Sequence, residues 1–285
     1  MAEVEENNVK WGSQKWFDNK LKEQSIENPS SYFSHGENGY QIFRHKHLTQ
    51  VAKDNLPTRS LNKILDVGCG TGHLVVSFKN KLNVPVGLGF DFVPGLIEMA
   101  NRDYKSVEFR VSALPDLPLE EKTMDLIIAS EVLYYLSQEN QRKALENINK
   151  TLTNQGVFFL TSKVGGQYYQ EEKFLKSTEG LFKIYHKEFI YNNFYNKLVF
   201  PLRAIQLIYQ GTREKTTRPG KLGNLFKKYP FIKTNKIIGF FLWLGNFFCS
   251  PILKSESFPA FCHSISKKLN FGKSGSNIIV IFEKV

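Results

Sequence analysis

The chain has 285 residues, of which 41% are hydrophobic and 23% are charged. This length and composition predict a folded protein with a sizeable core and exclude a disordered or fibrous one. The formal net charge of +11 is concentrated in one half, since residues 163–285 hold 20 Lys and Arg against 7 Asp and Glu. A basic half favours contact with an anionic membrane surface, a nucleic acid or an acidic substrate.

The chain begins with a polar and aromatic segment, residues 1–60, which predicts a helical lead-in with an amphipathic helix over residues 40–56. Residues 61–191 then alternate strand-length apolar segments with helix-length amphipathic segments, and residues 276–285 add one more strand. This alternation is typical of a parallel sheet covered by helices, so the predicted fold class is α/β. The predicted strands are KILDVG, VPVGLGFD, VEFRV, MDLIIAS, GVFFLTS, the segment 181–190 and NIIVIFEKV.

A glycine-rich turn follows the first predicted strand, with Gly68, Gly70 and Gly72 at alternate positions. Such glycines allow a positive φ and a close approach of ligand to backbone. Two neighbours argue against a pyrophosphate ligand. Asp66 would repel it, and His73 is too bulky for the third glycine position of a dinucleotide fingerprint.

The second predicted strand ends in Asp91, nineteen residues after Gly72. A carboxylate at this point can accept hydrogen bonds from both hydroxyls of a ribose. Asp66, at the end of the first strand, suits a cationic group instead. Together the two acidic strand ends favour S-adenosylmethionine, which carries a sulfonium and an amine and has no phosphate.

Five motifs in order, ILDVGCGTG, GFD, VEFRVSALPDLPL, MDLIIASEVLYYL and LTNQGVFFL, resemble those of class I S-adenosylmethionine-dependent methyltransferases. The resemblance covers about residues 60–163 and is greatest to small-molecule enzymes such as the ubiquinone and menaquinone methylases. It implies a Rossmann-like seven-stranded sheet with helices on both faces and an antiparallel last strand. It also implies S-adenosyl-L-methionine as the cofactor.

The resemblance assigns cofactor contacts to each motif. The methionine portion is expected at Asp66, Gly68, Cys69, Gly70 and Gly72, the ribose at Asp91 and Phe92, the adenine at Ser112, Ala113 and Leu114, and the methionyl side at Ser130 and Glu131. One motif departs from the family, which has Gly-Asp-Ala where this chain has Val111-Ser112-Ala113. A hydroxyl therefore replaces the carboxylate expected at the adenine amino group.

Residues 192–275 interrupt this pattern with many aromatic residues and lysines, and we expect a largely helical substrate-binding lid before the last strand. Its most apolar segment runs from Ile237 to Leu253. We favour a helix that lines the acceptor pocket or packs in the core, and the alternative is a helix at an anionic membrane surface. A spanning helix is disfavoured because Asn246 and Pro251 interrupt the segment.

Catalysis does not require a general base, because methyl transfer depends largely on bringing donor and acceptor into line. The candidates for a catalytic role are Tyr134, Tyr135, His35 and His186. Tyr40 and Arg44 could contact the cofactor carboxylate, although a place on the surface of the lead-in helix explains them equally well.

The expected acceptor is a small, hydrophobic or lipid-like molecule methylated on O, N or C. An RNA methyltransferase is the first alternative, suggested by the basic half of the chain. It is disfavoured because the chain lacks an Asn/Asp-Pro-Pro-Tyr motif and a Pro-Cys pair. The second alternative is a non-catalytic cofactor-binding or scaffold protein, which the altered adenine position allows.

The cysteines Cys69, Cys249 and Cys262 form no Cys-x-x-Cys pair and predict a reducing compartment without disulfides or bound metal. In a glycine turn, Cys69 is expected to be a packing residue and not a nucleophile. His45 and His47 do not share a helix face, so we expect them at the solvent surface. With no apolar run in the first thirty residues, a cytoplasmic protein is expected, with peripheral membrane association as an option.

Overall fold

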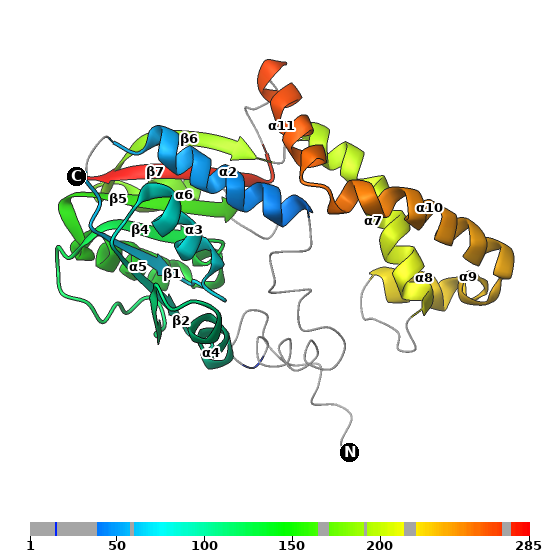
Figure 1. Ribbon diagram of the computed structural model, residues 1–285, viewed down its shortest axis with the longest axis horizontal. Coiled ribbons are helices and arrows are strands. Elements are labelled where there is room, and N and C mark those ends of the chain that lie inside the picture. The colour runs from blue at the N-terminus through cyan, green and yellow to red at the C-terminus, as the bar shows by residue number, and fades with distance from the viewer. Residues whose placement is uncertain are drawn as a thin grey trace. The chain divides into compact units, whose positions relative to one another are not determined.

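The computed structural model divides into two compact units (Figure 1). We call Arg44–Ile190 with Gly275–Val285 the sheet unit, and Glu37–Phe43 with Tyr191–Ser274 the helical unit. The residues that the structure describes are 15, 39–57, 60–164, 171–190, 193–213, 221–269 and 275–285.

The sheet unit contains seven strands in the order β3-β2-β1-β4-β5-β7-β6. Their bounds are β1 Lys63–Val67, β2 Val86–Asp91, β3 Glu108–Val111, β4 Met124–Ser130, β5 Leu152–Lys163, β6 Phe182–Ile190 and β7 Asn277–Lys284. The strands from β3 to β5 pair in parallel, whereas β7 runs antiparallel to both β5 and β6. The predicted seven-stranded sheet with an antiparallel last strand is therefore confirmed.

Helices connect the parallel strands of this unit. They are α3 His73–Leu82, α4 Pro94–Asp103, α5 Gln138–Thr151 and α6 Glu171–Thr178, with the short 3-10 helix η2 at Leu133–Tyr135, while α2 spans Gly39–Asn55. Local chemistry sets where α5 begins, because the Ser137 hydroxyl accepts a hydrogen bond from the Asn140 backbone N–H at 3.2 Å. Helix α2 lies within the predicted helical lead-in, residues 1–60, and is the helix of that segment whose bounds the structure describes.

Both faces of the sheet are buried, as neighbouring residues of β5 demonstrate. Phe159 meets Phe78 of α3 with ring centroids 5.0 Å apart. Phe158 points to the opposite face, where it stacks on Phe282 of β7 and belongs to the core that includes Leu145 of α5. Since side chains alternate along a strand, one apolar run fills two cores. The prediction of helices on both faces is confirmed.

The strand order places the site. β1 has β2 on one side and β4 on the other, so the connections leave β1 and β4 in opposite directions. In open α/β sheets, ligands bind in the crevice beyond the carboxyl ends of the strands at such a reversal. Asp66, Asp91 and Ser130 lie at or next to the carboxyl ends of β1, β2 and β4.

The helical unit is built from α7 Asn193–Arg213, α8 Lys221–Lys228, α9 Phe231–Thr234, α10 Lys236–Lys254 and α11 Ser257–Lys268. Figure 1 shows α10 running beside α7, and α11 also contacts α7. The ring of Tyr195 on α7 lies 6.4 Å from that of Phe258 on α11. The segment before the last strand is thus largely helical, as predicted.

Two expectations about burial are wrong. The apolar segment of α10 is not a core helix, because Cys249 is the one side chain of this helix that is buried among the described residues. By length and composition only, α10 is the one helix of the described residues that could cross a membrane.

The second error concerns the two histidines of α2. His45 is buried, and its Nδ1 lies 3.0 Å from Nδ1 of His73 on α3. His47 Nε2 lies 2.6 Å from Oε1 of Glu188 on β6. Different sides of α2 carry the two rings, but both sides are covered, so neither ring is at the solvent surface.

Candidate functional site

The glycine turn after β1 has the conformation that its sequence predicts. Gly68, Gly70 and Gly72 have φ angles of 75°, 55° and 80°. The turn is held against β2, because the Gly68 N–H donates to the Phe90 carbonyl at 2.7 Å. A Cβ at Gly72 would lie 2.5 Å from the Phe109 ring, whereas one at Gly70 would meet no atom of the described residues within 4 Å. The backbone at Gly70 is therefore open to a ligand.

Asp91 links β2 to this turn. Its Oδ2 accepts a hydrogen bond from the Gly70 N–H at 2.9 Å, and its Oδ1 accepts one from the Val93 N–H at 3.0 Å. Burial raises the pKa of Asp91, and these N–H donors oppose the rise. A carboxylate has about four acceptor positions, so capacity for ribose hydroxyls is left.

Asp66 is the most isolated acidic group of the site. Its side chain is buried at the end of β1, and among the described residues its Oδ1 has no hydrogen-bond partner. Burial raises the pKa of Asp66 well above its usual value, the negative charge of Asp91 adds to the rise, and the Arg44 guanidinium opposes it. An unpartnered buried carboxylate oxygen is costly, so a cationic donor would be bound favourably here. The amine of S-adenosylmethionine fits this requirement.

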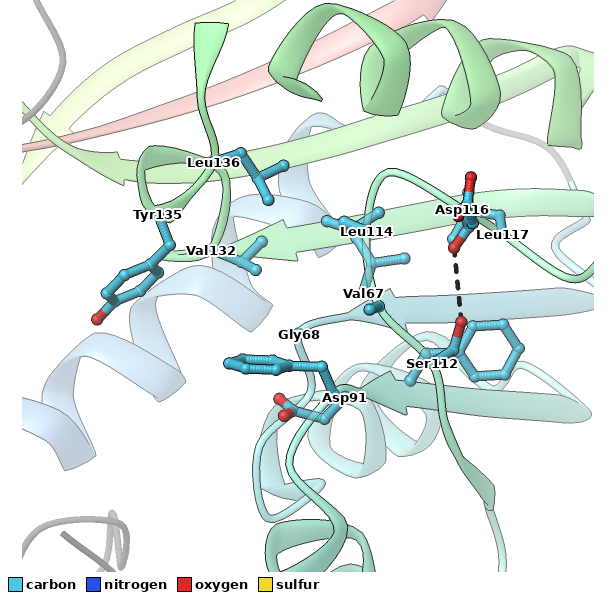
Figure 2. A pocket seen from close by; sticks show the side chains of 13 residues that line it. Val67, Gly68, Asp91, Ser112, Leu114, Asp116, Leu117, Val132, Tyr135 and Leu136 are labelled. Atoms are coloured by element: carbon cyan, nitrogen blue, oxygen red, sulfur yellow. Dashed lines mark hydrogen bonds between the residues drawn. The ribbon is translucent and has the colours of Figure 1, made fainter. Parts of the chain in front are cut away.

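A cavity of about 200 Å³ opens beside the glycine turn (Figure 2). The predicted residues that line it are Gly68, Asp91, Phe92, Ser112, Ala113 and Leu114. Residues that sequence reasoning did not single out complete the lining: Val67, Phe90, Asp116, Leu117, Val132 and Leu136. Figure 2 shows Asp91 on one side of the cavity and the apolar side chains of Leu114, Val132 and Leu136 on the other. Such walls suit an adenine ring and a ribose.

The adenine end contains a carboxylate, that of Asp116, although serine replaces the aspartate of the family motif. Ser112 lines the cavity, and its hydroxyl donates to the Asp116 backbone carbonyl at 3.5 Å. Asp116 lies four residues further on and also lines the cavity. The sequence signal was the acidic residue in LPDLPL, which follows the serine closely enough to share its loop.

Ser130 ends β4 and Glu131 follows it, but neither is among the cavity-lining residues. Arg44 Nη2 donates to Ser130 Oγ at 2.8 Å, to Thr161 Oγ1 at 2.9 Å and to Glu131 Oε1 at 3.3 Å. Asn277 Nδ2 also donates to Glu131 Oε1, at 2.9 Å. Arg44 is therefore a buried network residue, and its placement on the helix surface is wrong. The Tyr40 side chain lies outside the described residues.

Glu131 adopts a φ of 59°, which is uncommon for a residue other than glycine. The network around it holds this backbone in place, because the Glu131 N–H donates to the Thr161 carbonyl at 2.9 Å. Residues with such conformations gather at functional sites when their surroundings enforce them. This conformation turns the chain from β4 into the segment that carries Val132 and Tyr135 to the cavity.

Of the tyrosine candidates, Tyr135 lines the cavity, and Figure 2 shows it at the end away from Ser112. The Tyr134 ring lies next to it, with centroids 4.7 Å apart. Burial raises the pKa of Tyr134, and the charge of Glu131 raises it further. The Tyr134 phenol consequently keeps its proton and can orient a group by hydrogen bonding, but it is no base.

His186 is not among the residues that line this cavity. His186 lies on β6, which is separated from β4 by β5 and β7, and its Nε2 is 3.4 Å from Glu188 Oε2. His35 lies outside the described residues. Burial raises the pKa of the Cys69 thiol well above its usual value, and Asp66 raises it further. A neutral buried thiol is a poor nucleophile, in agreement with a packing role for Cys69.

Comparison with known proteins adds to this geometry. Residues 64–156 match the sequence model of a family described as a methyltransferase domain. The chain is 30% identical over 148 residues to an uncharacterized protein of Rickettsia prowazekii (strain Madrid E), covering 50% of this chain and 58% of that protein. It is 29% identical over 151 residues to a phosphoethanolamine N-methyltransferase of Triticum aestivum, covering 50% and 27%. The match thus spans less than two thirds of either relative.

A solved structure is similar in fold over nearly the whole chain. It is one chain of a complex from Haloferax volcanii. The complex contains the Trm112 methyltransferase activator and a protein described as a methyltransferase. The similarity has a TM-score of 0.50 at 13% identity and covers 96% of this chain and 98% of that one.

The strand order, the glycine turn and the acidic strand ends define a Rossmann-like nucleoside-binding domain of the class I type. The matched segment, residues 64–156, lies within this sheet unit and is similar to a methyltransferase domain, and these features give it the site of the class I, S-adenosylmethionine-dependent type. S-adenosylmethionine is accordingly the cofactor of this domain.

Proposed function

We propose that this protein transfers a methyl group from S-adenosylmethionine to a small, hydrophobic or lipid-like acceptor. The observation that carries the proposal is the buried Oδ1 of Asp66 near the carboxyl end of β1, which has no hydrogen-bond partner among the described residues. A phosphate-bearing nucleotide would meet like charge at this point, whereas a cationic amine would receive an acceptor.

When bound, the cofactor would supply an electrophilic methyl group on a positively charged sulfur, with the neutral thioether as the leaving group. The residues of this chain bind and orient. Asp91 holds the ribose, Asp66 neutralises the amine, and Leu114 with Val132 excludes water from the cavity. Alignment of donor and acceptor of this kind is worth about 7–11 kcal/mol, so no side chain has to act as a base.

The helical unit is the part of the chain that we assign to acceptor choice. Relatives of the matched segment include a phosphoethanolamine N-methyltransferase, a ubiquinone/menaquinone biosynthesis C-methyltransferase and a malonyl-[acyl-carrier protein] O-methyltransferase. The same cofactor-binding core thus occurs in enzymes that methylate nitrogen, carbon or oxygen. We therefore assign the choice of acceptor to residues outside 64–156. Exposed aromatic side chains of the helical unit support a hydrophobic acceptor. The three free, buried cysteines support a reducing, cytoplasmic location.

An RNA acceptor is the second candidate, and the basic second half of the chain is the observation that favours it. We rank it lower because the basic residues of the helical unit accompany exposed Phe and Ile side chains instead of forming a purely polar surface. A steep loss of RNA affinity with rising salt, together with methylation of that RNA, would reverse the ranking.

Calorimetry with S-adenosylmethionine, its demethylated product, NAD and ATP tests the cofactor. We expect binding of the first two only. Transfer of a labelled methyl group into a solvent-extractable fraction of a cell extract then tests catalysis. If no extract is methylated, the protein is a non-catalytic cofactor-binding protein. If the protein bound NAD and did not bind S-adenosylmethionine, the proposal would be overturned.

A further inference from the structure

Helix α10 is strongly apolar, yet among the described residues only one of its side chains, that of Cys249, is buried. The covered side faces α7, since a Cβ built at Gly245 would lie 3.0 Å from Cγ2 of Ile205. Cys249, one turn further along the same side, is the buried side chain of the helix. These contacts fix which side of α10 belongs to the interior of the helical unit.

Beyond this contact, α10 carries a set of large apolar side chains that are between 40% and 69% exposed. We call this set the α10 stripe: Ile237, Phe240, Phe241, Phe247, Phe248 and Ile252. Each is three, four or seven residues from another member of the set, and so they lie within one broad face of the helix. Exposed apolar surface of this extent marks an interaction site, since isolated surface hydrophobics need no partner but a continuous stripe does.

The charge around the α10 stripe has one sign. Between residues 215 and 255 the chain contains eight Lys and Arg and no Asp or Glu. Lys236 and Lys254 stand at the two ends of α10 and are exposed. Just before the helix, Lys228 and Lys233 lie 5.3 and 5.0 Å from the ring centroids of Tyr229 and Phe226. Apolar and cationic groups are thus presented together.

We propose that the α10 stripe docks this protein onto an anionic lipid bilayer, with α10 lying in the plane of the interface. The stripe would enter the boundary between headgroups and acyl chains, while the lysines contact the phosphates. Trp243, exposed on the same helix, is a residue type enriched at this depth. The inference concerns location and does not depend on the proposed catalysis.

An interfacial position fits the helical unit better than a spanning one. α10 packs along α7, which exposes Lys197 and Arg203, and a spanning α10 would draw these charges into the hydrocarbon or break the packing. A second copy of the chain is also a poor occupant, because it would bring one lysine-rich surface against another. Charge complementarity selects anionic lipid.

The test uses the full chain and vesicles of phosphatidylcholine alone or mixed with phosphatidylglycerol. We expect co-sedimentation with the anionic vesicles, weakened on raising salt from about 0.05 M to about 0.5 M because screening shortens the range of the lysine attraction. In a Trp11→Phe, Trp16→Phe background, emission from Trp243 should shift to shorter wavelength on binding. Protein that stays in the supernatant with every vesicle composition would overturn the proposal.

Two variants distinguish binding through the α10 stripe from nonspecific adsorption of the protein to vesicles. Phe240→Ser/Phe241→Ser/Phe248→Ser should lower the vesicle partition coefficient by about a hundredfold, since each phenyl ring leaves the acyl boundary. Tyr185→Ser, which removes an exposed apolar side chain of β6 in the sheet unit, should leave it unchanged. The melting temperature should stay the same in both, because these side chains are exposed.

Other occupants of the stripe give distinct results. Light scattering that finds a dimer in wild type and a monomer in the triple variant would replace lipid by a second copy. Resistance of the bound protein to alkaline carbonate extraction would mean a spanning helix. Loss of cofactor affinity in the triple variant would mean that the stripe covers the sheet unit instead. Any of these would overturn the docking proposal without touching the cofactor site.

Discussion

The carboxylate of Asp91 accepts a hydrogen bond from the backbone N–H of Gly70 at 2.9 Å, so the end of β2 fixes the turn that follows β1. One side chain thereby shapes the loop and faces the cavity. The same group is expected to receive the ribose, so cofactor binding and loop geometry are coupled through it.

Asp91→Ala should weaken S-adenosylmethionine binding by about 1.5–3 kcal/mol, the range for hydrogen bonds to a charged group, with the fold retained. Calorimetry gives the affinity, and circular dichroism checks the fold. Asp103→Ala, which removes an exposed aspartate at the end of α4, is the control and should bind normally. Undiminished affinity in a folded Asp91→Ala protein would mean that other groups hold the ribose.

Asp66→Asn should weaken cofactor binding and yet stabilise the protein without cofactor. Burial and Asp91 raise the pKa of Asp66, so the folded state holds its proton above the usual value of 3.8. Its contribution to stability is present below that pH and is lost as pH rises through the folded-state pKa. The variant should therefore melt about 3 °C higher at neutral pH, which corresponds to a gain of roughly 1 kcal/mol in the free energy of unfolding for a chain of this size.

The same ionisation should govern affinity. A cationic amine binds the carboxylate and not the acid, so wild-type affinity should rise with pH across the raised pKa of Asp66, with proton release on binding. Calorimetry in buffers of different ionisation enthalpy counts these protons. A pH dependence that survives unchanged in Asp66→Asn would assign the titration to another group.

Ser112 has no carboxylate to accept a hydrogen bond from the adenine amino group. We expect Asp116 to make this contact in its place. We expect Asp116→Asn to cost about 1–2 kcal/mol of cofactor affinity, the range of a hydrogen bond, and Ser112→Asp to leave affinity equal or greater. The demethylated cofactor with its adenine amino group replaced by oxygen tests the contact directly. If wild type and Asp116→Asn discriminate equally against this analogue, Asp116 does not touch the amino group.

Arg44→Met should destabilise the sheet unit by about 3 kcal/mol, because it leaves Glu131 partly buried without its cationic partner. Adding Glu131→Gln should recover part of this loss, since the charge at position 131 is then removed as well. Urea denaturation of both variants measures the difference. Equal stability of the single and double variants would show that Arg44 acts only through its hydrogen bonds to Ser130 and Thr161.

The sheet and the cofactor-facing strand ends could be predicted from the sequence because their causes are local. A strand buried on both faces needs a continuous apolar run, and a turn with positive φ needs glycine, so KILDVG and the glycines after it carry their own structure. Asp66 and Asp91 then follow from their positions at the ends of two such runs. Parallel strands bring those ends together without further information.

Tertiary structure decided what depends on groups far apart in the chain. Arg44 meets Glu131 across 87 residues, and no pattern around either residue signals the contact. The same holds for His45, which is buried because α3 brings His73 against it. For α10 the sequence determined an apolar helix of 19 residues, but exposure is a property of what packs against a helix, and among the described residues Cys249 is the one side chain of this helix that is buried.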